Sequence, residues 1–220
     1  IAWGDSGGHI RNVLNTIFQS ELFRTQAAAR HKIKTPFEFT VSALRALRGS
    51  LTAGGFGAST DGYDLEEPMD DMGMELFRRS DPDGWPEVGN EWLDTGTLSE
   101  RLRFIQNFMM EDTDPLKDVD NGNGGDDNIS DPTALIVDRL PLLDRTNPDA
   151  VIDLFLVFVF PGEGFANLDL ERNECLYLLN TDSAENPSPF SALTVGSPEY
   201  DQRVRALVGL ILASPRFQEQ

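Results

Sequence analysis

The chain has very little cysteine and histidine. Its single cysteine, Cys175, excludes an intramolecular disulfide and a cysteine-based metal cluster. Its two histidines stand apart, His9 at a helix start and His31 in the basic run RHKIK, so they do not suggest a metal pair or a general acid and base. We therefore expect neither a zinc centre nor histidine-based catalysis.

Basic residues and long apolar runs are also scarce. The 220 residues include 18 Lys and Arg against 37 Asp and Glu, a net charge of −19. Such a surface repels phosphate backbones, so we expect no nucleic-acid partner. It favours cations, and either bound calcium or a saline habitat would explain it. No apolar run reaches the roughly 18 residues that span a bilayer, so we expect no membrane insertion.

Enough apolar residues are present to form one sizeable core. They make up 40 % of the chain and include 14 Phe and 3 Trp. The length suits one domain, so we expect residues 1–220 to form a single helical domain with an acidic loop inserted at about 112–131. Because the chain opens at Ile1 without Met, we expect the C-terminal portion of a longer protein, with any signal peptide lying outside it.

Helical periodicity recurs along the chain, and alternating strand patterns do not. The expected helices span 9–24, 36–48, 97–109, 168–179 and 199–213, with further starts at Asp131-Pro132 and Asn147-Pro148. Residues 151–160, VIDLFLVFVF, suit a buried strand by composition, but the Asn-Pro start and Pro161 favour a buried helix. The predicted fold is mainly α, an irregular multi-helix domain with long Gly-, Asp- and Pro-rich loops and little or no β-sheet. Residues 49–72 and 187–196 are expected to be loops.

The stretch Asp81–Met110 is the expected hub of this fold. Its Pro82–Gly84 turn leads to Trp85 and Trp92, which we expect to close the core. A capping box over Thr97–Glu100 then opens a helix. On this helix we expect an inward stripe of Leu98, Leu102, Ile105 and Met109, and Phe104 and Phe108 widen that stripe. On the helix that follows Thr35, the side chains expected to point inward are Phe37, Val41, Leu44 and Leu47.

Two segments repeat one scheme. In residues 9–24 and 204–218 an apolar helix ends at a serine, and a phenylalanine follows three residues later. The aligned pairs are Arg11 with Arg205, Ile17 with Ile211, Ser20 with Ser214 and Phe23 with Phe217. Two copies are too few for a solenoid, so we expect a pseudo-symmetric helical domain in which Phe23 points inward as an anchor.

The acidic segment from Asp118 to Asp131 alternates oxygen donors with glycine. Calcium takes six to eight oxygen ligands at about 2.3–2.6 Å, and glycine lets the backbone turn tightly around the ion. The segment begins like an EF-hand loop but then departs from that pattern, with Gly122, Asn123 and Ile129 at its fifth, sixth and twelfth places. It is either a variant calcium loop or a solvated acidic loop. The candidate ligands are Asp118, Asp120, Asn123, Asp126, Asp127 and Asp131.

Other short motifs lack their context. Gly4-Asp5-Ser6-Gly7-Gly8 matches the serine-protease nucleophile motif but precedes a helix, with no histidine upstream. We interpret it as a glycine-rich helix entry. GGFG at 54–57 lacks the Lys-Ser/Thr of a phosphate loop. Among 37 acidic residues, some pair always satisfies the spacing of a glycosidase by chance. We therefore assign no catalytic residues.

Three motifs, KIKTPFEFTVSALRAL (32–47), PDGWPEVGNEWLDTGTLSERLRF (82–104) and LVGLILASPRF (207–217), together resemble the bacterial domain-of-unknown-function family 1800. The resemblance covers the chain as the C-terminal part of a longer member. It implies a helix-rich protein exported to the periplasm or the cell exterior, and it offers no catalytic residues. The acidic segment lies outside the resemblance.

These observations predict a non-catalytic binding or assembly protein, exported and stabilised by calcium. Its expected partners are other protein subunits, either copies of itself or different chains. The alternative is a hydrolase-like enzyme, or a subunit of one, whose catalytic part lies in a region before this chain. Assembly is favoured because the repeated helix units and long loops come without a nucleophile and base.

Overall fold

The computed structural model describes residues 2–5, 7–24, 32–48, 63–79, 82, 84–86, 89–109, 131–163 and 167–219. Within these ranges the regular structure is helical, and only isolated bridges join Ile33 to Glu219 and Thr181 to Pro187. The predicted mainly-α fold is confirmed. The helices are α1 (Ala2–Asp5), α2 (Ile10–Gln19), α3 (Glu21–Arg24), α4 (Pro36–Arg48), α5 (Tyr63–Asp71), α6 (Thr95–Met109), α7 (Pro132–Arg139), α8 (Pro148–Val159), α9 (Asp169–Leu179), α10 (Pro198–Ala213) and α11 (Pro215–Gln218), with 3-10 turns η1 (Gly89–Glu91) and η4 (Phe190–Ala192).

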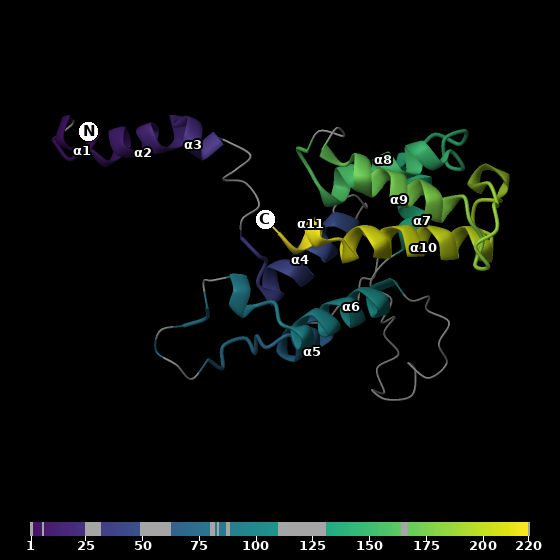
Figure 1. The fold of residues 1–220 in the computed structure, drawn as a ribbon, viewed down its shortest axis with the longest axis horizontal. Helices are drawn as coiled ribbons and strands as arrows, with labels where there is room; N and C mark the ends of the chain where they lie inside the picture. Colours follow the sequence, from purple (N-terminus) through teal and green to yellow (C-terminus); the bar gives the residue numbers. More distant parts are fainter. Residues whose placement is uncertain are drawn as a thin grey trace.

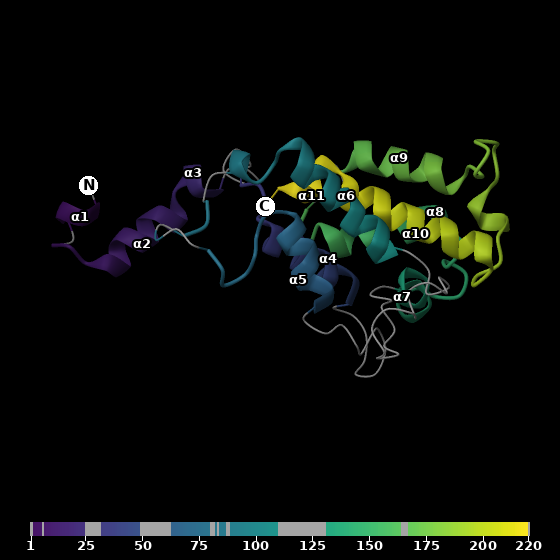
Figure 2. The same cartoon turned by 90° about the horizontal axis from the view of Figure 1, so that it is seen from below.

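Helix α10 is the centre of the core. It packs against α6, α7, α8, α9 and α11, so it has more neighbouring helices than α6, the helix of the expected hub Asp81–Met110 (Figures 1 and 2). The side chains along one broad face of α10 are buried: Tyr200, Val204, Leu207, Val208, Ile211 and Leu212. The Tyr200 ring stacks on Phe190 with centroids 4.9 Å apart, and its hydroxyl donates to the Arg145 carbonyl at 2.6 Å.

The apolar run at 151–160 is helical, as the capping signals indicated. Asn147 caps α8 by accepting from the Asp149 N–H at 3.1 Å, and Pro148 occupies the first turn, where a missing N–H costs nothing. The helix buries Val151, Ile152, Phe155 and Leu156 completely. The β-branched and aromatic composition of this run favours a strand, but the run is a helix that packs against α4, α9 and α10.

The predicted inward faces of α4 and α6 are confirmed in part: Leu47 of α4 and Phe104, Ile105, Phe108 and Met109 of α6 are buried as expected. Helix α4 buries Phe39, Thr40, Ala43 and Leu47 and leaves Phe37 exposed. Helix α6 buries Arg101, Phe104, Ile105, Phe108 and Met109 and leaves Leu98 and Leu102 exposed. Each helix has apolar side chains on more than one face, and the helices packed against it determine which face is buried in the core.

The predicted capping box of α6 is also wrong. The helix begins two residues earlier, where Asp94 Oδ1 accepts from the Thr97 N–H at 2.7 Å and Thr97 Oγ1 accepts from the Asp94 N–H at 2.9 Å. The hydrogen bond that the Thr97 N–H donates to the Asp94 carboxylate is the largest cause of the lowered pKa of Asp94. Asp94 therefore occupies the cap, and Thr97 plays the role that Glu100 was expected to take.

The loop predicted over 49–72 is wrong for its second half, and residues 49–62 lie outside the described part. Residues 63–71 form α5 despite Pro68, whose missing N–H disfavours a helix interior. Met69 and the following Met72 are buried, and α5 packs on α4 and α6. Gly73, at φ +88°, ends the helix while the Met74 N–H donates to the Met69 carbonyl at 2.8 Å. Burial of the two methionines offsets the cost of the proline.

The first three helices form an arm that projects from the rest of the molecule. In both ribbon views α1–α3 lie at one end, away from the layers formed by α4–α11 (Figures 1 and 2). We call Ala2–Arg24 the N-terminal arm and α4–α11 the body. The prediction that Phe23 points inward is wrong, because its side chain is 53 % exposed.

Candidate functional site

Most of the predicted calcium ligands lie outside the described residues: Asp118, Asp120, Asn123, Asp126 and Asp127. Asp131 is described. Its Oδ1 caps α7 by accepting from the Ala134 N–H at 2.9 Å, which is the capping role that its position before Pro132 predicted. Across the ranges that the structure covers, no cluster of three or more His, Cys, Asp or Glu is arranged to hold a metal ion. The calcium loop therefore stays a prediction.

The residues of the other short motifs form no site within the described part of the chain. Ser6 and His31 lie outside the described part, and His9 stands at the start of α2 without capping it through its side chain. Cys175 is buried in α9, and burial raises the pKa of its thiol to about 12. This cysteine therefore stays protonated at neutral pH, which disfavours a role as a nucleophile.

A buried arginine joins the first two sequence motifs to Gln218, the residue directly after the third. Arg101, in α6, is 0 % exposed. Its guanidinium donates to the Gln218 Oε1 at 2.9 Å, the Lys34 carbonyl at 2.7 Å and the Trp92 carbonyl at 3.4 Å. It also lies over the Phe39 ring, 4.9 Å from the centroid. Burial lowers the pKa of Arg101 to about 10, so the side chain remains charged at neutral pH.

Backbone contacts complete this junction. The Lys34 N–H donates to the Gln218 carbonyl at 2.7 Å. A Cβ on Gly89 would lie 2.9 Å from the Ile33 side chain, so only glycine lets η1 approach this segment. Trp92 is buried, its Nε1 donates to the Pro86 carbonyl at 2.9 Å, and its ring lies 5.9 Å from that of the partly exposed Trp85. Trp92 thus contributes its backbone carbonyl to the arginine junction, and its ring packs beside that of Trp85.

The role of Arg101 was not predicted from the sequence, although one signal pointed to it. Arg101 lies three and four residues before Phe104 and Ile105, and so on the apolar stripe of α6. A charge at that place in a stripe indicates a buried group with polar partners. We conclude that the segments around the sequence motifs meet at Arg101 in a structural junction.

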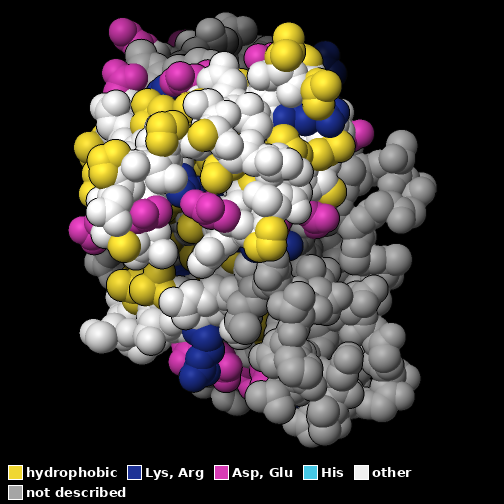
Figure 3. Space-filling model, turned by 90° about the vertical axis from the view of Figure 1, so that its right-hand side faces the viewer, with side chains coloured by type: hydrophobic (Ala, Val, Ile, Leu, Met, Phe, Trp, Pro, Cys, Tyr) yellow, Lys and Arg dark blue, Asp and Glu magenta, His cyan; other side chains and the backbone are white. Residues whose placement is uncertain are grey.

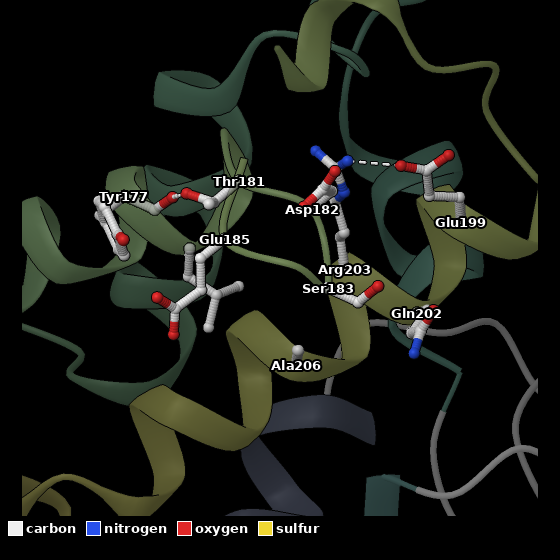
Figure 4. A pocket seen from close by; sticks show the side chains of 10 residues that line it. Tyr177, Thr181, Asp182, Ser183, Glu185, Glu199, Gln202, Arg203 and Ala206 are labelled. Carbon is white, nitrogen blue, oxygen red and sulfur yellow. Dashed lines mark hydrogen bonds and ion pairs between the residues drawn. The ribbon is translucent and has the colours of Figure 1, made fainter. Parts of the chain in front are cut away.

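A pocket lined by charged side chains lies between α9 and α10. Its volume is about 340 Å³, and its apolar wall is formed by Tyr177, Leu178 and Ala206. Figure 4 shows Tyr177 and Thr181 on one side, Glu199 on the other and Arg203 between them. Thr181 closes the end of α9 by donating to the Tyr177 carbonyl.

Arg203 fixes the floor of this pocket. Its guanidinium donates to the Leu179 carbonyl at 2.9 Å and to the carbonyl and hydroxyl of Ser188, both at 2.7 Å, and it pairs with Glu199. Asp182 Oδ1 accepts from the Asn186 and Ala184 N–H groups, and these bonds lower its pKa. With Glu185 the lining holds three carboxylates against one arginine, so the pocket suits a small cation with an apolar body better than an anion.

The arm exposes a run of large apolar side chains. Ile10, Leu14, Ile17, Phe18, Leu22 and Phe23, with Trp3 before them, are each at least 44 % exposed. The first four follow helical spacing and form one stripe along α2, and Leu22 and Phe23 lie on α3, after the bend at Ser20. On the end of the body shown in Figure 3, apolar side chains are interspersed with acidic and basic ones.

The comparisons with known proteins give one finding. The family model described as a protein of unknown function (DUF1800) matches residues 1–219, essentially the whole chain. No curated protein and no solved structure matches it.

Proposed function

Since the chain belongs to the DUF1800 family, whose function is unknown, we propose its role from its own surface: it is an exported assembly protein that binds another protein subunit through the N-terminal arm. The exposed apolar side chains of α2 and α3 carry this proposal. Fully burying a Leu, Ile or Phe side chain stabilises by about 1.5–3 kcal/mol, so covering a half-exposed stripe of this length contributes several kcal/mol.

The arm has the features of a protein-binding surface. Large contiguous apolar patches on soluble proteins mark interaction sites, and this one lies on a helix that projects from the body. Its apolar residues recur every three or four positions, which is the spacing of a helix that docks into a groove. Arg11 is the one charged side chain within α2. None of the described helices is at once long and apolar enough to cross a bilayer.

The assembly role predicts that one charge in the stripe abolishes incorporation. Ile17→Lys places an ammonium group in the apolar stripe, while Asn15→Lys adds the same charge to the polar face of the same helix. We expect native mass spectrometry of tagged chain recovered from its source cells to show the assembly mass for the native chain and for Asn15→Lys, and the free chain for Ile17→Lys. Equal masses for all three would contradict the proposed function.

We also propose that calcium binds the acidic segment and stabilises the fold. Calcium at 100 times its dissociation constant stabilises by about 2.7 kcal/mol. For a chain of this size we therefore expect the Tm to rise by roughly 5–10 °C, with EDTA reversing the rise. Differential scanning calorimetry with magnesium at equal ionic strength separates calcium binding from screening. Asp118→Asn with Asp120→Asn is expected to remove the rise; an unchanged Tm in millimolar calcium would contradict the site.

A further inference from the structure

We infer that the partner of the arm is a second copy of this chain, and that α2 of each copy docks into the groove between α6 and α10 of the other. This inference rests on the proposed assembly function and adds the identity of the partner. Two arms in two grooves give a closed, two-fold symmetric dimer, in which each copy supplies the same two surfaces.

The groove is apolar and shallow enough to receive a helix. Its volume is about 400 Å³. Leu102, Ile105 and Met109 of α6 form one wall, while Ala206, Gly209 and Ala213 line it on α10. Small residues at this spacing form a smooth track along one face of α10, which lets a second helix approach closely. Leu102 is 41 % exposed, so part of this apolar wall faces solvent.

The groove and the arm match in length. The apolar stripe of α2 runs from Ile10 to Phe18, about 12 Å at 1.5 Å per residue. The lining on α10 runs from Arg205 to Ala213, again about 12 Å. Arg205 closes one end, where it pairs with Asp201 at 2.6 Å and donates to the Met109 carbonyl at 3.5 Å. The apolar stripe of α2 therefore fits between the closed end and Ala213.

The charges of the two parts favour contact between arm and body. The arm, residues 2–24, carries two basic and two acidic residues, a net charge of zero, and the charged side chain within α2 is Arg11. Residues 25–220, with 16 basic and 35 acidic residues, carry −19. Such a body repels a second body but does not repel the uncharged arm of its partner, which favours contact between arm and body over contact between two bodies.

The body contains a buried copy of the arm's module, in which a helix ends at a serine and a phenylalanine follows three residues later. At the end of α2, Ser20 Oγ accepts from the Phe23 N–H at 3.2 Å; at the end of α10, Ser214 Oγ accepts from the Phe217 N–H at 3.3 Å. The two serines have nearly equal backbone angles, φ −65° and ψ 142° against φ −61° and ψ 146°. The module of α10 and α11 packs on α6, whereas its copy in the arm exposes the equivalent face. A helix with this bend is therefore already suited to pack beside α6.

The test uses the full chain and two surface variants. Ile17→Lys disables the arm and Leu102→Lys disables the groove, with Asn15→Lys and Asn107→Lys as controls that add the same charge to exposed polar positions of the same helices. Sedimentation equilibrium from 1 to 100 µM is expected to show a dimer for the native chain and for both controls. Each disabling variant alone is expected to raise the dimer dissociation constant at least tenfold.

Mixing the two disabled variants decides the mode of contact. The Leu102→Lys chain keeps its arm and the Ile17→Lys chain keeps its groove, so the mixture is expected to recover a heterodimer through one arm in one groove, visible by mass. A Leu102→Lys chain that stays dimeric, with no gain on mixing, would show arm-to-arm pairing and overturn the inference. A native chain that is monomeric at 100 µM would overturn it too, while the incorporation test with source cells would still judge the proposed function separately.

Discussion

Replacing Arg101 by leucine is expected to destabilise the protein by about 3–5 kcal/mol, because the lost guanidinium leaves buried acceptors without donors. These acceptors are the Lys34 and Trp92 carbonyls and the Gln218 Oε1, which come from three distant parts of the chain. Urea unfolding followed by far-UV circular dichroism measures the loss. The expected change is a lower midpoint with an unchanged slope.

The control for Arg101 lies two residues away on the same helix. Arg103 is exposed and pairs with Glu100 at 3.0 Å, so Arg103→Leu is expected to change stability by no more than about 0.5 kcal/mol. Equal midpoints for the two variants would show that leucine fills the junction as well as arginine does. The motifs would then be joined by apolar packing rather than by the guanidinium.

The second large effect is expected at Phe217, whose counterpart in the arm provides a matched comparison. Phe217 is 1 % exposed, lies 5.4 Å from the Phe39 ring and has the Lys34 Nζ 3.6 Å from its centroid. Phe217→Ala is expected to cost about 3–5 kcal/mol by leaving a cavity between α4 and α11. Phe23→Ala makes the same change in an exposed copy, and in the isolated chain it is expected to cost less than about 0.5 kcal/mol.

Thermal and urea unfolding of these two variants, at protein concentrations low enough to keep the chain monomeric, measures the difference. A stability loss at Phe23 that equals the loss at Phe217 would mean that the arm is packed on its own body in solution. A loss at Phe217 only would show that the same serine-and-phenylalanine module is structural in α10 and α11 and available for binding in α2 and α3.

The position and type of most helices followed from the sequence, because caps and periodicity act over a few residues. Thr35 and Glu38 exchange hydrogen bonds at 2.8 and 3.2 Å, and Asp131, Asn147 and Ser197 each cap the helix that follows them. The repeat was also visible, and its two serines have nearly the same conformation. These features need no information about distant parts of the chain.

Which face of each helix is buried was decided by the tertiary structure. Phe37, Leu98 and Leu102 are apolar and were expected inside, but Phe39 and Arg101 occupy the interior instead. Nothing local distinguishes these choices, because burial depends on which helices pack together. Helix α5 follows the same rule, since Met69 and Met72 find partners on α4 and α6 that no sequence window contains.

The candidate sites divide along the same line. The acidic segment could be proposed from its residues, because ligand chemistry depends on composition and short spacing. The Arg203 pocket, the Arg101 junction and the groove between α6 and α10 could not, because each joins residues far apart in the chain. The sequence by itself determined the helices, their caps and the repeated module. Only the tertiary structure decided that one copy of this module lies in the core and the other on an exposed arm, since burial depends on the neighbours that folding supplies.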